Sequence, residues 1–307
     1  MKVVVTGGAG FIGSHLVDQL VRDGVEQIVV VDNLARGSVE RLAAHAGNRA
    51  VQFVAGDVRD AALLNSLFDG AIFVYHLAAQ SNVMGAVSDI GYSFSSNVVG
   101  TFNVLAAARD AGVQRVVFSS SREVYGEAAT LPVAETQPLD AKNAYGASKA
   151  AGELYCRVFG ATYGLETAIL RFANVYGARD TGRVIPLWLD AAADGRDLLV
   201  YGGAQVIDFV WIDQIVAALV RATTADIAGQ PINIGSGVGT PILELAERIL
   251  AISGSAARVD LQPARSVEVA RFVADVALMR AKLALEPAPD PLFGLTQLWD
   301  IHQQEPQ

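Results

Sequence analysis

The chain has 307 residues, of which 52% are hydrophobic and 18% charged, as is typical of a globular protein with a sizeable core. The net charge of −9 disfavours nucleic acid and anionic membranes as main partners, because an acidic surface repels both. A single cysteine, Cys156, excludes a disulfide framework, and four scattered histidines show no metal-binding spacing, so no metal is expected. The chain begins in a strand pattern rather than a signal sequence and has no apolar stretch of membrane length, so the expected location is cytoplasmic.

The first half of the chain alternates short apolar runs with amphipathic segments. The apolar runs predict strands at residues 2–6, 27–31, 51–54, 72–76, 115–119 and 167–172. The amphipathic segments predict helices at residues 12–22, 61–68, 94–111 and 143–159. This alternation predicts an α/β fold, a Rossmann-type doubly wound parallel sheet built from right-handed βαβ units.

After about residue 174 the pattern changes to helices separated by connections rich in glycine and proline. Helices are predicted at residues 186–194, 213–223, 241–252 and 275–283. We therefore predict a dinucleotide-binding domain over residues 1–173, to which later segments return. Residues 174–307 are predicted to form mainly a smaller α/β substrate-binding portion over the carboxyl edge of the sheet, where ligands bind in such folds.

A glycine-rich sequence, GGAGFIGSHL, follows the first predicted strand and opens the first predicted helix. Gly7, Gly10 and Gly13 would allow a tight turn and let the backbone approach a pyrophosphate at the positive end of the helix. Asp32, at the end of the second strand, is placed to accept hydrogen bonds from both hydroxyls of an adenosine ribose. It would repel a 2′-phosphate, so the sequence predicts NAD rather than NADP. The alternative is that the glycines form only a tight turn.

Residues after the next two predicted strands extend this site. Asp57 could accept a hydrogen bond from the adenine amino group, whereas Asp60 is expected to cap the following helix. Ala78 and Ala79 are small enough for the backbone to pass close to a cofactor. His76 is expected to be a core residue with satisfied hydrogen bonds.

The sequence YGASK places Tyr145 and Lys149 four residues apart on one face of a predicted helix. A tyrosine with an ordinary pKa of about 10 is a poor base at neutral pH, but a lysine ammonium and the positive nicotinamide ring would favour its phenolate. Tyr145 could then take a proton from a sugar hydroxyl, and Ser121 at the end of the fifth strand could share that proton. Such a pair alone is more often a solvated helix face. The preceding dinucleotide motif and serine-ended strand favour the catalytic interpretation.

These motifs together resemble the extended short-chain dehydrogenase/reductases of the NAD-dependent nucleotide-sugar epimerase/dehydratase family. The resemblance covers nearly the whole chain and rests on TGGAGFIGSHL, VDNL, GDVRD, HLAAQSNV, NVVGTFNVL, SSSREVYG, YGASKAAGE, LRFANVYGAR and DFVWID. It implies that Ser121, Tyr145 and Lys149 form the catalytic set, with Tyr145 as general base and Lys149 also holding the nicotinamide ribose. The implied cofactor contacts are Gly7, Gly10, Phe11, Ile12, Gly13, Asp32, Asn33, Asp57, Val58, Leu77, Ala78, Ala79, Asn97, Tyr145 and Lys149.

The resemblance also implies a nucleotide-sugar substrate, with a UDP-sugar favoured. The implied substrate contacts are Ser121, Arg122, Asn174, Tyr201, Arg265 and Glu268. Asn174 matches a contact to the diphosphate, and Tyr201 an aromatic residue that lines the base pocket. Asn97 matches an asparagine that supports the catalytic arrangement, with a polar helix residue bonded locally as the alternative. The helices at 94–111 and 143–159 match those that form a homodimer interface in the family.

One position departs from the family pattern. Members usually carry an arginine that clamps the substrate diphosphate where this chain has Ile207, which cannot donate a hydrogen bond. Arg265 then becomes the first candidate to bind the diphosphate, with Arg183 and Arg271 as lesser candidates. Glu268 stands where an aspartate often binds ribose.

The stretch SSSREVYG leaves two reactions open. In nucleotide-sugar 4,6-dehydratases a glutamate at the position of Glu123 takes the C5 proton during elimination, and UDP-glucuronate decarboxylases carry a similar sequence. Arg122 replaces the acid that protonates the leaving hydroxyl in many dehydratases. Arginine cannot easily do this, but it could bind an anionic group such as a C6 carboxylate.

Other stretches, among them TGGAGFIGSHLVDQL and VVVDNLARG, are closest in character to UDP-glucose 4-epimerase-like proteins. We therefore expect an NAD-dependent 4-epimerase that acts on a UDP-hexose or UDP-hexuronate through a transient 4-keto intermediate. The alternative is a 4,6-dehydratase or UDP-glucuronate decarboxylase that uses Glu123. A second alternative is a non-catalytic NAD-binding regulator.

Overall fold

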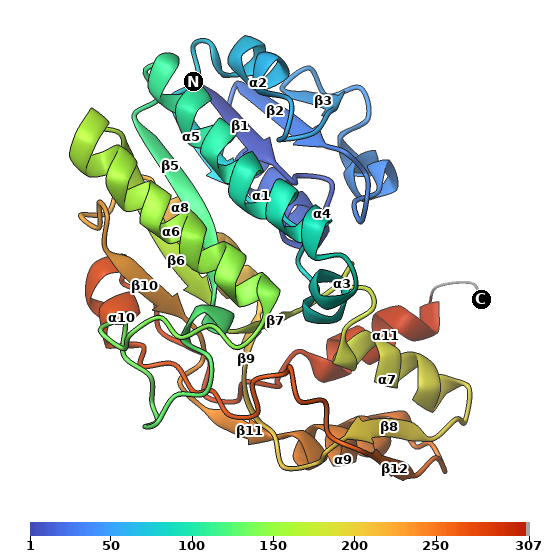
Figure 1. The fold of residues 1–307 in the computed structure, drawn as a ribbon. Coiled ribbons are helices and arrows are strands. Elements are labelled where there is room, and N and C mark those ends of the chain that lie inside the picture. Colours follow the sequence, from blue (N-terminus) through green and yellow to red (C-terminus); the bar gives the residue numbers. More distant parts are fainter. Residues whose placement is uncertain (305–307) are drawn as a thin grey trace.

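The computed structural model describes residues 1–304, and its central feature is a seven-stranded sheet (Figure 1). All neighbouring strands in it are parallel, in the order β10-β6-β5-β4-β1-β2-β3. The strands are β1 (Lys2–Thr6), β2 (Gln27–Asp32), β3 (Val51–Ala55), β4 (Phe73–His76), β5 (Arg115–Ser121), β6 (Glu166–Phe172) and β10 (Pro231–Ile234). The strand order reverses between β1 and β4, which opens a ligand-binding crevice at the carboxyl edge of the sheet. The predicted Rossmann-type fold is confirmed.

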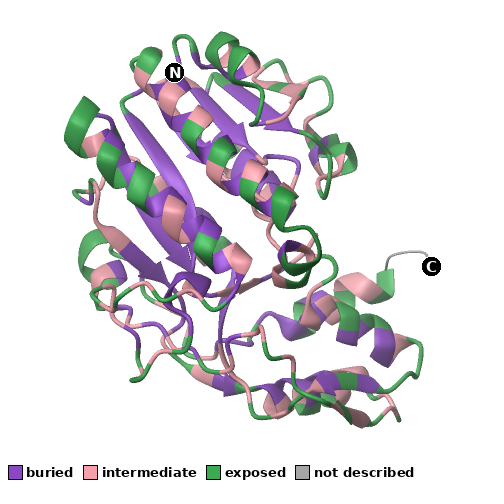
Figure 2. Cartoon of the chain, in the orientation of Figure 1, coloured by how far each residue is buried: buried purple, intermediate pink, exposed green. Residues whose placement is uncertain are grey.

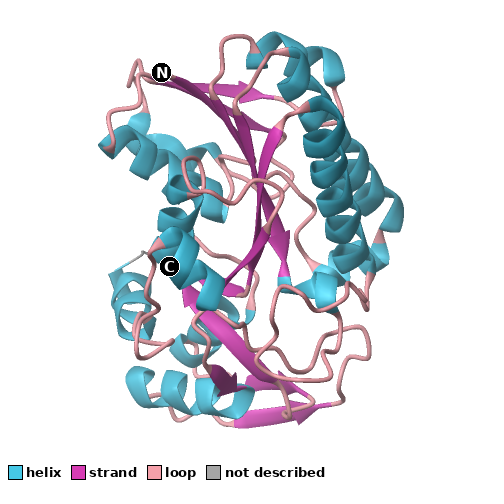
Figure 3. Cartoon of the chain, turned by 90° about the vertical axis from the view of Figure 1, so that its left-hand side faces the viewer, coloured by secondary structure: helices cyan, strands magenta, loops and turns pink. Residues whose placement is uncertain are grey.

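Helices cover both faces of this sheet, which explains why its strands are apolar at successive positions (Figures 2 and 3). Val3 and Val5 of β1 belong to the core that contains α1 and α8, whereas Val4 points into the opposite core, formed with α2, α5 and α6. The helices are α1 (Phe11–Arg22), α2 (Ala61–Phe68), α5 (Gly100–Asp110), α6 (Ala144–Tyr163) and α8 (Ile212–Arg221).

The helix predicted at residues 94–111 is interrupted in the structure. It consists of α4 (Ile90–Phe94), a π-helical turn η2 (Ser95–Val99) and α5. Single π-helical turns inside helices frequently mark functional positions. Shorter pieces elsewhere are η1 (Val39–His45), α3 (Val83–Ser88) and η3 (Arg122–Tyr125).

The C-terminal portion lies across the carboxyl edge of the large sheet and contains two small sheets (Figure 1). One is formed by β11 (Gly239–Pro241), β9 (Val206–Trp211) and β7 (Asn174–Tyr176), and the other by β12 (Val259–Gln262) and β8 (Leu198–Tyr201). The helices of this portion are α7 (Val184–Ala193), α9 (Ile242–Ser253), α10 (Ala277–Leu283) and α11 (Leu295–Gln304). Within residues 1–304, no helix has both the length and the hydropathy needed to cross a membrane.

Two later segments return to the large sheet. The sequence PINI, which we read as part of a connection, forms the edge strand β10 beside β6. Its proline stands at the first position of an edge strand, where a missing N–H is tolerated. Helix α8 packs against α1 on the same face of the sheet. The Rossmann-type part is therefore completed by chain that follows much of the C-terminal portion.

Candidate active site

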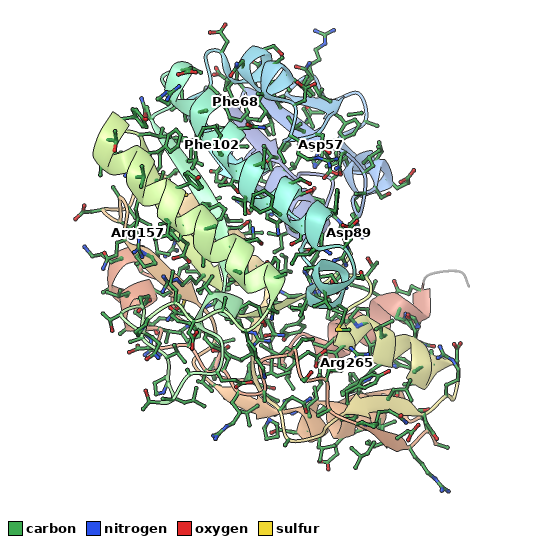
Figure 4. All side chains as sticks on the ribbon, in the orientation of Figure 1. Asp57, Phe68, Asp89, Phe102, Arg157 and Arg265 are labelled. Atoms are coloured by element: carbon green, nitrogen blue, oxygen red, sulfur yellow. The ribbon has the colours of Figure 1, made fainter. Side chains whose placement is uncertain are left out.

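A cavity of about 640 Å³ opens between the carboxyl edge of the large sheet and the C-terminal portion. All the predicted cofactor, catalytic and substrate residues line it except Asn97. Asp57 on the sheet side and Arg265 on the C-terminal side mark the two parts of the chain that form its walls (Figure 4). The topology thus brings together residues from both halves of the sequence.

The glycine-rich turn fits closely against the chain that follows β4. Gly7 has a φ of +74°, and a Cβ atom there would lie 2.6 Å from the backbone nitrogen of Ala78. A Cβ atom on Gly13 would lie 2.2 Å from the carbonyl oxygen of Gly7, so both positions require glycine. Gly10 provides no side-chain cap for α1, and the first N–H groups of the helix therefore remain available for an anion.

Asp32 is buried at the end of β2 with its carboxylate fixed by two backbone N–H groups. Its Oδ2 accepts from Ala9 at 3.0 Å and its Oδ1 from Leu34 at 2.8 Å. Burial raises the pKa of Asp32, whereas these two hydrogen bonds act in the opposite direction. Each carboxylate oxygen retains a second lone pair for a ligand hydroxyl, as ribose binding requires.

Asp57, another predicted cofactor residue, is held by an ion pair and a hydrogen bond. Asp57 is paired with Arg59 at 2.7 Å, and this hydrogen-bonded guanidinium lowers the pKa of the carboxyl to about 2. Asn33 also donates to Asp57, at 2.8 Å. Two predictions are confirmed: Asp60 caps α2 by accepting from a backbone N–H, and buried His76 has hydrogen-bond partners at both ring nitrogens.

Tyr145 and Lys149 lie in the first turns of α6, which faces the end of β5. Asn143 begins this helix by accepting a hydrogen bond from the N–H of Gly146 at 2.9 Å. Lys149 is buried, and its Nζ donates to the carbonyl of Ser119 at 2.7 Å. Burial lowers the pKa of Lys149 to about 7.

The electrostatic surroundings of Tyr145 differ from the expectation. Burial raises the pKa of Tyr145 to about 12, and the Arg183 guanidinium and the Ser121 hydroxyl are the main opposing influences. We expected the Lys149 ammonium to favour the phenolate. Lys149 directs its Nζ to the β5 backbone, and the guanidinium groups of Arg183 and Arg122 lower the pKa of the phenol.

Asn97 lies outside the cavity, in the π-helical turn, and its side chain connects three elements. Its Nδ2 donates to Ser148 of α6 at 2.9 Å and to the carbonyl of Gln80 at 3.0 Å, and its Oδ1 accepts from the N–H of Gln80 at 2.7 Å. These partners are distant in sequence, so Asn97 is not a helix residue bonded only locally. It positions both the chain after β4 and the start of α6.

Glu123 follows β5 and has a donor at each carboxylate oxygen. Its Oε1 forms an ion pair with Arg122 Nη2 at 2.9 Å, and its Oε2 accepts from Asn143 Nδ2 at 2.7 Å. Glu123 is 5% exposed, so these protein donors replace water around it. The guanidinium of Arg122 also lies over the ring of Phe272.

Three of the predicted substrate residues in the C-terminal portion contact one another, and the fourth, Asn174, lies apart from them. The guanidinium of Arg265 lies 3.6 Å from the ring centroid of Tyr201 and donates to Glu268 at 3.2 Å. Asn174 lies at the start of β7, and its buried Oδ1 has no hydrogen-bond partner among residues 1–304. Ile207 lines the same cavity from β9.

Sequence analysis did not single out Arg36 and Arg41, which also line the cavity. Both follow the second predicted strand, in the stretch LARGSVER. Their position a few residues after Asp32 could have indicated that they belong to the same site. No cluster of three or more histidine, cysteine, aspartate or glutamate side chains within the described part of the chain could hold a metal ion.

Comparison with known proteins decides the family. Residues 3–235 match the model of the NAD dependent epimerase/dehydratase family. The chain belongs to this family. NAD is accordingly its cofactor, and the glycine-rich turn, the uncapped start of α1 and the fixed Asp32 carboxylate fit that group.

Relatives of this epimerase/dehydratase family member include enzymes with two different reactions. The chain is 36% identical to a UDP-glucose 4-epimerase of Mycolicibacterium smegmatis, with 100% of both chains covered. Its structure is similar to that of a Thermotoga maritima UDP-glucose 4-epimerase with UDP-glucose (TM-score 0.93, 32% identity, 99% of each chain). It is also similar to a Streptomyces venezuelae dTDP-glucose 4,6-dehydratase with NAD bound (TM-score 0.95, 32% identity, 99% of this chain and 98% of the other).

Proposed function

We propose that this family member is an NAD-dependent nucleotide-sugar 4-epimerase that acts on a UDP-hexose or UDP-hexuronate. The observation that carries the proposal is the double engagement of Glu123 by Arg122 and Asn143. Each oxygen of Glu123 is held by a donor of the protein, which favours a positioning role for this carboxylate over that of the base for elimination. Arg122 cannot act as the acid that elimination also requires. The relatives named UDP-glucose 4-epimerases support the same choice.

Bound NAD supplies reversible hydride transfer at C4 of the sugar. Tyr145 takes the proton of the C4 hydroxyl, while Arg183 and Ser121 counteract the effect of burial on its pKa. Ser121, at the end of β5, bonds the same hydroxyl and shares the proton. Lys149 has donor capacity beyond its bond to Ser119 and holds the nicotinamide ribose. Release of the transient 4-keto sugar is prevented by its nucleotide, which stays anchored while the sugar turns.

The nucleotide is bound by the residues of the C-terminal portion. Tyr201 and Arg265, stacked on each other, provide an aromatic surface and a guanidinium, and Glu268 fixes that guanidinium in place. Asn174 contributes a side-chain amide close to the diphosphate. Arg265 thereby supplies the positive charge that the usual arginine provides at the position of Ile207.

Product analysis tests this proposal directly. Purified protein is incubated with UDP-glucose, UDP-galactose, UDP-glucuronate and dTDP-glucose, and products are examined by mass spectrometry and NMR. A product of unchanged mass with inverted C4 supports the epimerase. Loss of water or carbon dioxide supports the dehydratase or decarboxylase. NAD binding without turnover of any sugar supports the regulator.

Glu123→Gln separates the first two reactions. Glutamine cannot accept from both Arg122 and Asn143, so we expect a loss of stability of about 1–3 kcal/mol from the unpaired buried groups. The epimerisation rate should fall less than about tenfold, because Glu123 has no proton-transfer role in it. Glu127→Gln, which removes a half-exposed carboxylate paired with Lys142, is the matched control. Complete loss of turnover by a stably folded Glu123→Gln protein would favour the eliminating enzyme.

We also propose a homodimer formed through α5 and α6, which lie side by side on one face of the molecule (Figure 2). Large apolar side chains are exposed there: Phe102 (44%) on α5, and Leu154 (55%) and Val158 (50%) on α6. Phe94, at the end of the preceding α4, is 57% exposed. The rings of Phe102 and Tyr155 join the two helices in an edge-to-face contact. Exposed apolar side chains on two neighbouring helices can pack against the same side chains of a second copy about a two-fold axis, which is the geometry of an isologous interface.

Placing a charge in this face should separate the subunits. Leu154→Glu would bury a carboxylate against its partner, and we expect a dimer dissociation constant at least about a hundredfold higher. Sedimentation velocity across a protein concentration series measures this shift. Leu261→Glu, at a leucine of β12 that is 62% exposed, is the control and should leave the association unchanged. A wild-type protein that sediments only as a monomer at micromolar concentration would contradict the dimer.

A further inference from the structure

Three arginines line the cavity close to the glycine-rich turn: Arg36, Arg41 and Arg183. Arg36 lies in the loop after β2, a few residues beyond Asp32, and Arg41 lies in η1. Arg183 ends the loop between β7 and α7, and its guanidinium is 5.4 Å from the ring centroid of Phe11, the first residue of α1. Two separate loops therefore bring positive charge to the dinucleotide half of the cavity.

These loops are tied to each other across the cavity. Arg41 Nη1 donates to the carbonyl of Arg36 at 3.0 Å, and its Nη2 donates to Thr181 Oγ1 at 3.2 Å. Arg36 Nη1 reaches Ser81, in the chain after β4, at 3.3 Å. The loop after β2 is thus joined on one side to residues 178–183, here named the strap, and on the other to the chain that packs against Gly7.

The strap is also fixed from outside by α1. The carbonyl of Ala178 is 2.8 Å from His15 Nε2, and Arg179 forms an ion pair with Asp18 at 2.8 Å. Both partners belong to α1, the helix whose start faces the cavity. The strap therefore has a defined position over the start of α1, held by α1 on its outer side and by Arg41 on the side of η1.

The arginines carry more positive charge than the protein neutralises. Arg183 forms an ion pair with Asp180 at 3.0 Å, whereas neither Arg36 nor Arg41 forms an ion pair with any acidic side chain of residues 1–304. Burial and the nearby Arg183 guanidinium lower the pKa of Arg36, and the Asp180 carboxylate opposes this effect only in part. A doubly charged anion between these groups would remove that repulsion.

We propose that Arg36, Arg41 and Arg183 bind the pyrophosphate of NAD, and that the Arg41–Thr181 bond holds the strap across it so that the cofactor stays bound between turnovers. The cluster adjoins Asp32 and the start of α1, which bind the dinucleotide. Arg265, Tyr201 and Asn174, which face the sugar nucleotide, belong to the other wall. This inference rests on the NAD dependence of the family and is independent of the reaction catalysed.

The test measures NAD release from the purified holoenzyme, by mass spectrometry after dilution into excess isotopically labelled NAD. Arg36→Gln and Arg41→Gln should each accelerate release about tenfold, because each removes a charge-assisted contact to a phosphate. Thr181→Val keeps all three charges but breaks the link to the strap, and it should accelerate release by a smaller factor, about threefold. Arg49→Gln removes an exposed arginine outside the cavity and should release NAD at the wild-type rate.

A second measurement shows whether the arginines bind the pyrophosphate of NAD or the diphosphate of the sugar nucleotide. Affinity for UDP is measured by calorimetry on holoenzyme saturated with NAD, and it should change less than about twofold in every variant. Unchanged NAD release together with weakened UDP binding would overturn the proposal and assign the arginines to the substrate. Release rates equal to that of Arg49→Gln in all variants would also overturn it. Arg36→Lys, which keeps the charge, provides a second readout if the glutamine variant is poorly folded.

Discussion

Tyr145→Phe should lower kcat for 4-epimerisation by about 1,000-fold, because the proposed mechanism assigns to Tyr145 the transfer of the proton from the C4 hydroxyl. Phenylalanine preserves the ring in the first turn of α6, so the NAD content and the melting temperature should remain those of the wild type. Tyr155→Phe on the exposed side of the same helix is the control and should leave kcat unchanged.

The pH profile adds a second signature. Burial raises the pKa of Tyr145 to about 12 in the protein alone, so at neutral pH most of the phenol carries its proton. The wild-type rate should therefore increase with pH as the phenolate forms, and Tyr145→Phe should lose this dependence. A variant that retains more than a tenth of the wild-type kcat would assign the base to another residue.

Lys149→Met should abolish most of the activity, by about 100-fold or more, and should also make the protein more stable at neutral pH. Lys149 is 3% exposed, and burial lowers its pKa to about 7. At pH 6 the folded protein must therefore hold a buried ammonium that the unfolded chain leaves in water. Methionine fills similar space without charge but loses the bond to the Ser119 carbonyl, so the net gain in the free energy of unfolding is about 2–4 kcal/mol.

The pH dependence of the free energy of unfolding shows whether Lys149→Met stabilises the protein by removing a buried charge or by better packing. As pH rises above 7, the folded wild type loses the proton while the unfolded chain keeps it, so wild-type stability increases until the pH reaches the ordinary lysine pKa. The advantage of Lys149→Met should therefore be largest at pH 6 and disappear towards pH 10. Urea unfolding of protein freed of NAD, at pH 6, 8 and 9.5, measures it. Lys142→Met, at a half-exposed ion pair, should show no such trend, and a gain independent of pH would contradict the explanation.

The parts of the fold that the sequence predicts well are those in which local pattern and burial agree. Strands β1 and β2 contain the uninterrupted apolar runs VVV and IVVV because helices cover both faces of the sheet, and the helical segment between them is long enough to recognise. The glycine-rich turn can also be predicted from the sequence, because the backbone approaches so closely at Gly7 and Gly13 that only glycine fits there.

The features that sequence analysis missed depend on partners far away in the chain. Strand β10 has four residues, of which the first is a proline, and it is recognised as a strand through its pairing with β6. The π-helical turn at Asn97 is stabilised by bonds to Gln80 and Ser148 that no local pattern reveals. The hydrogen bonding of Glu123 depends on Asn143, which lies twenty residues later in the chain. The loop that holds Arg183 near Tyr145 lies later still in the sequence.

The return of β10 to the edge of the large sheet has a consequence for how the protein is made. Until residues 231–234 have left the ribosome, one edge of β6 presents unpaired N–H and C=O groups, which is the kind of surface that recruits strands of other chains. Helix α8, which covers α1, also emerges only after β7, β8 and β9. During synthesis the N-terminal half is therefore not completed before the C-terminal half begins to form, and the edge of β6 stays open while residues 173–230 are added.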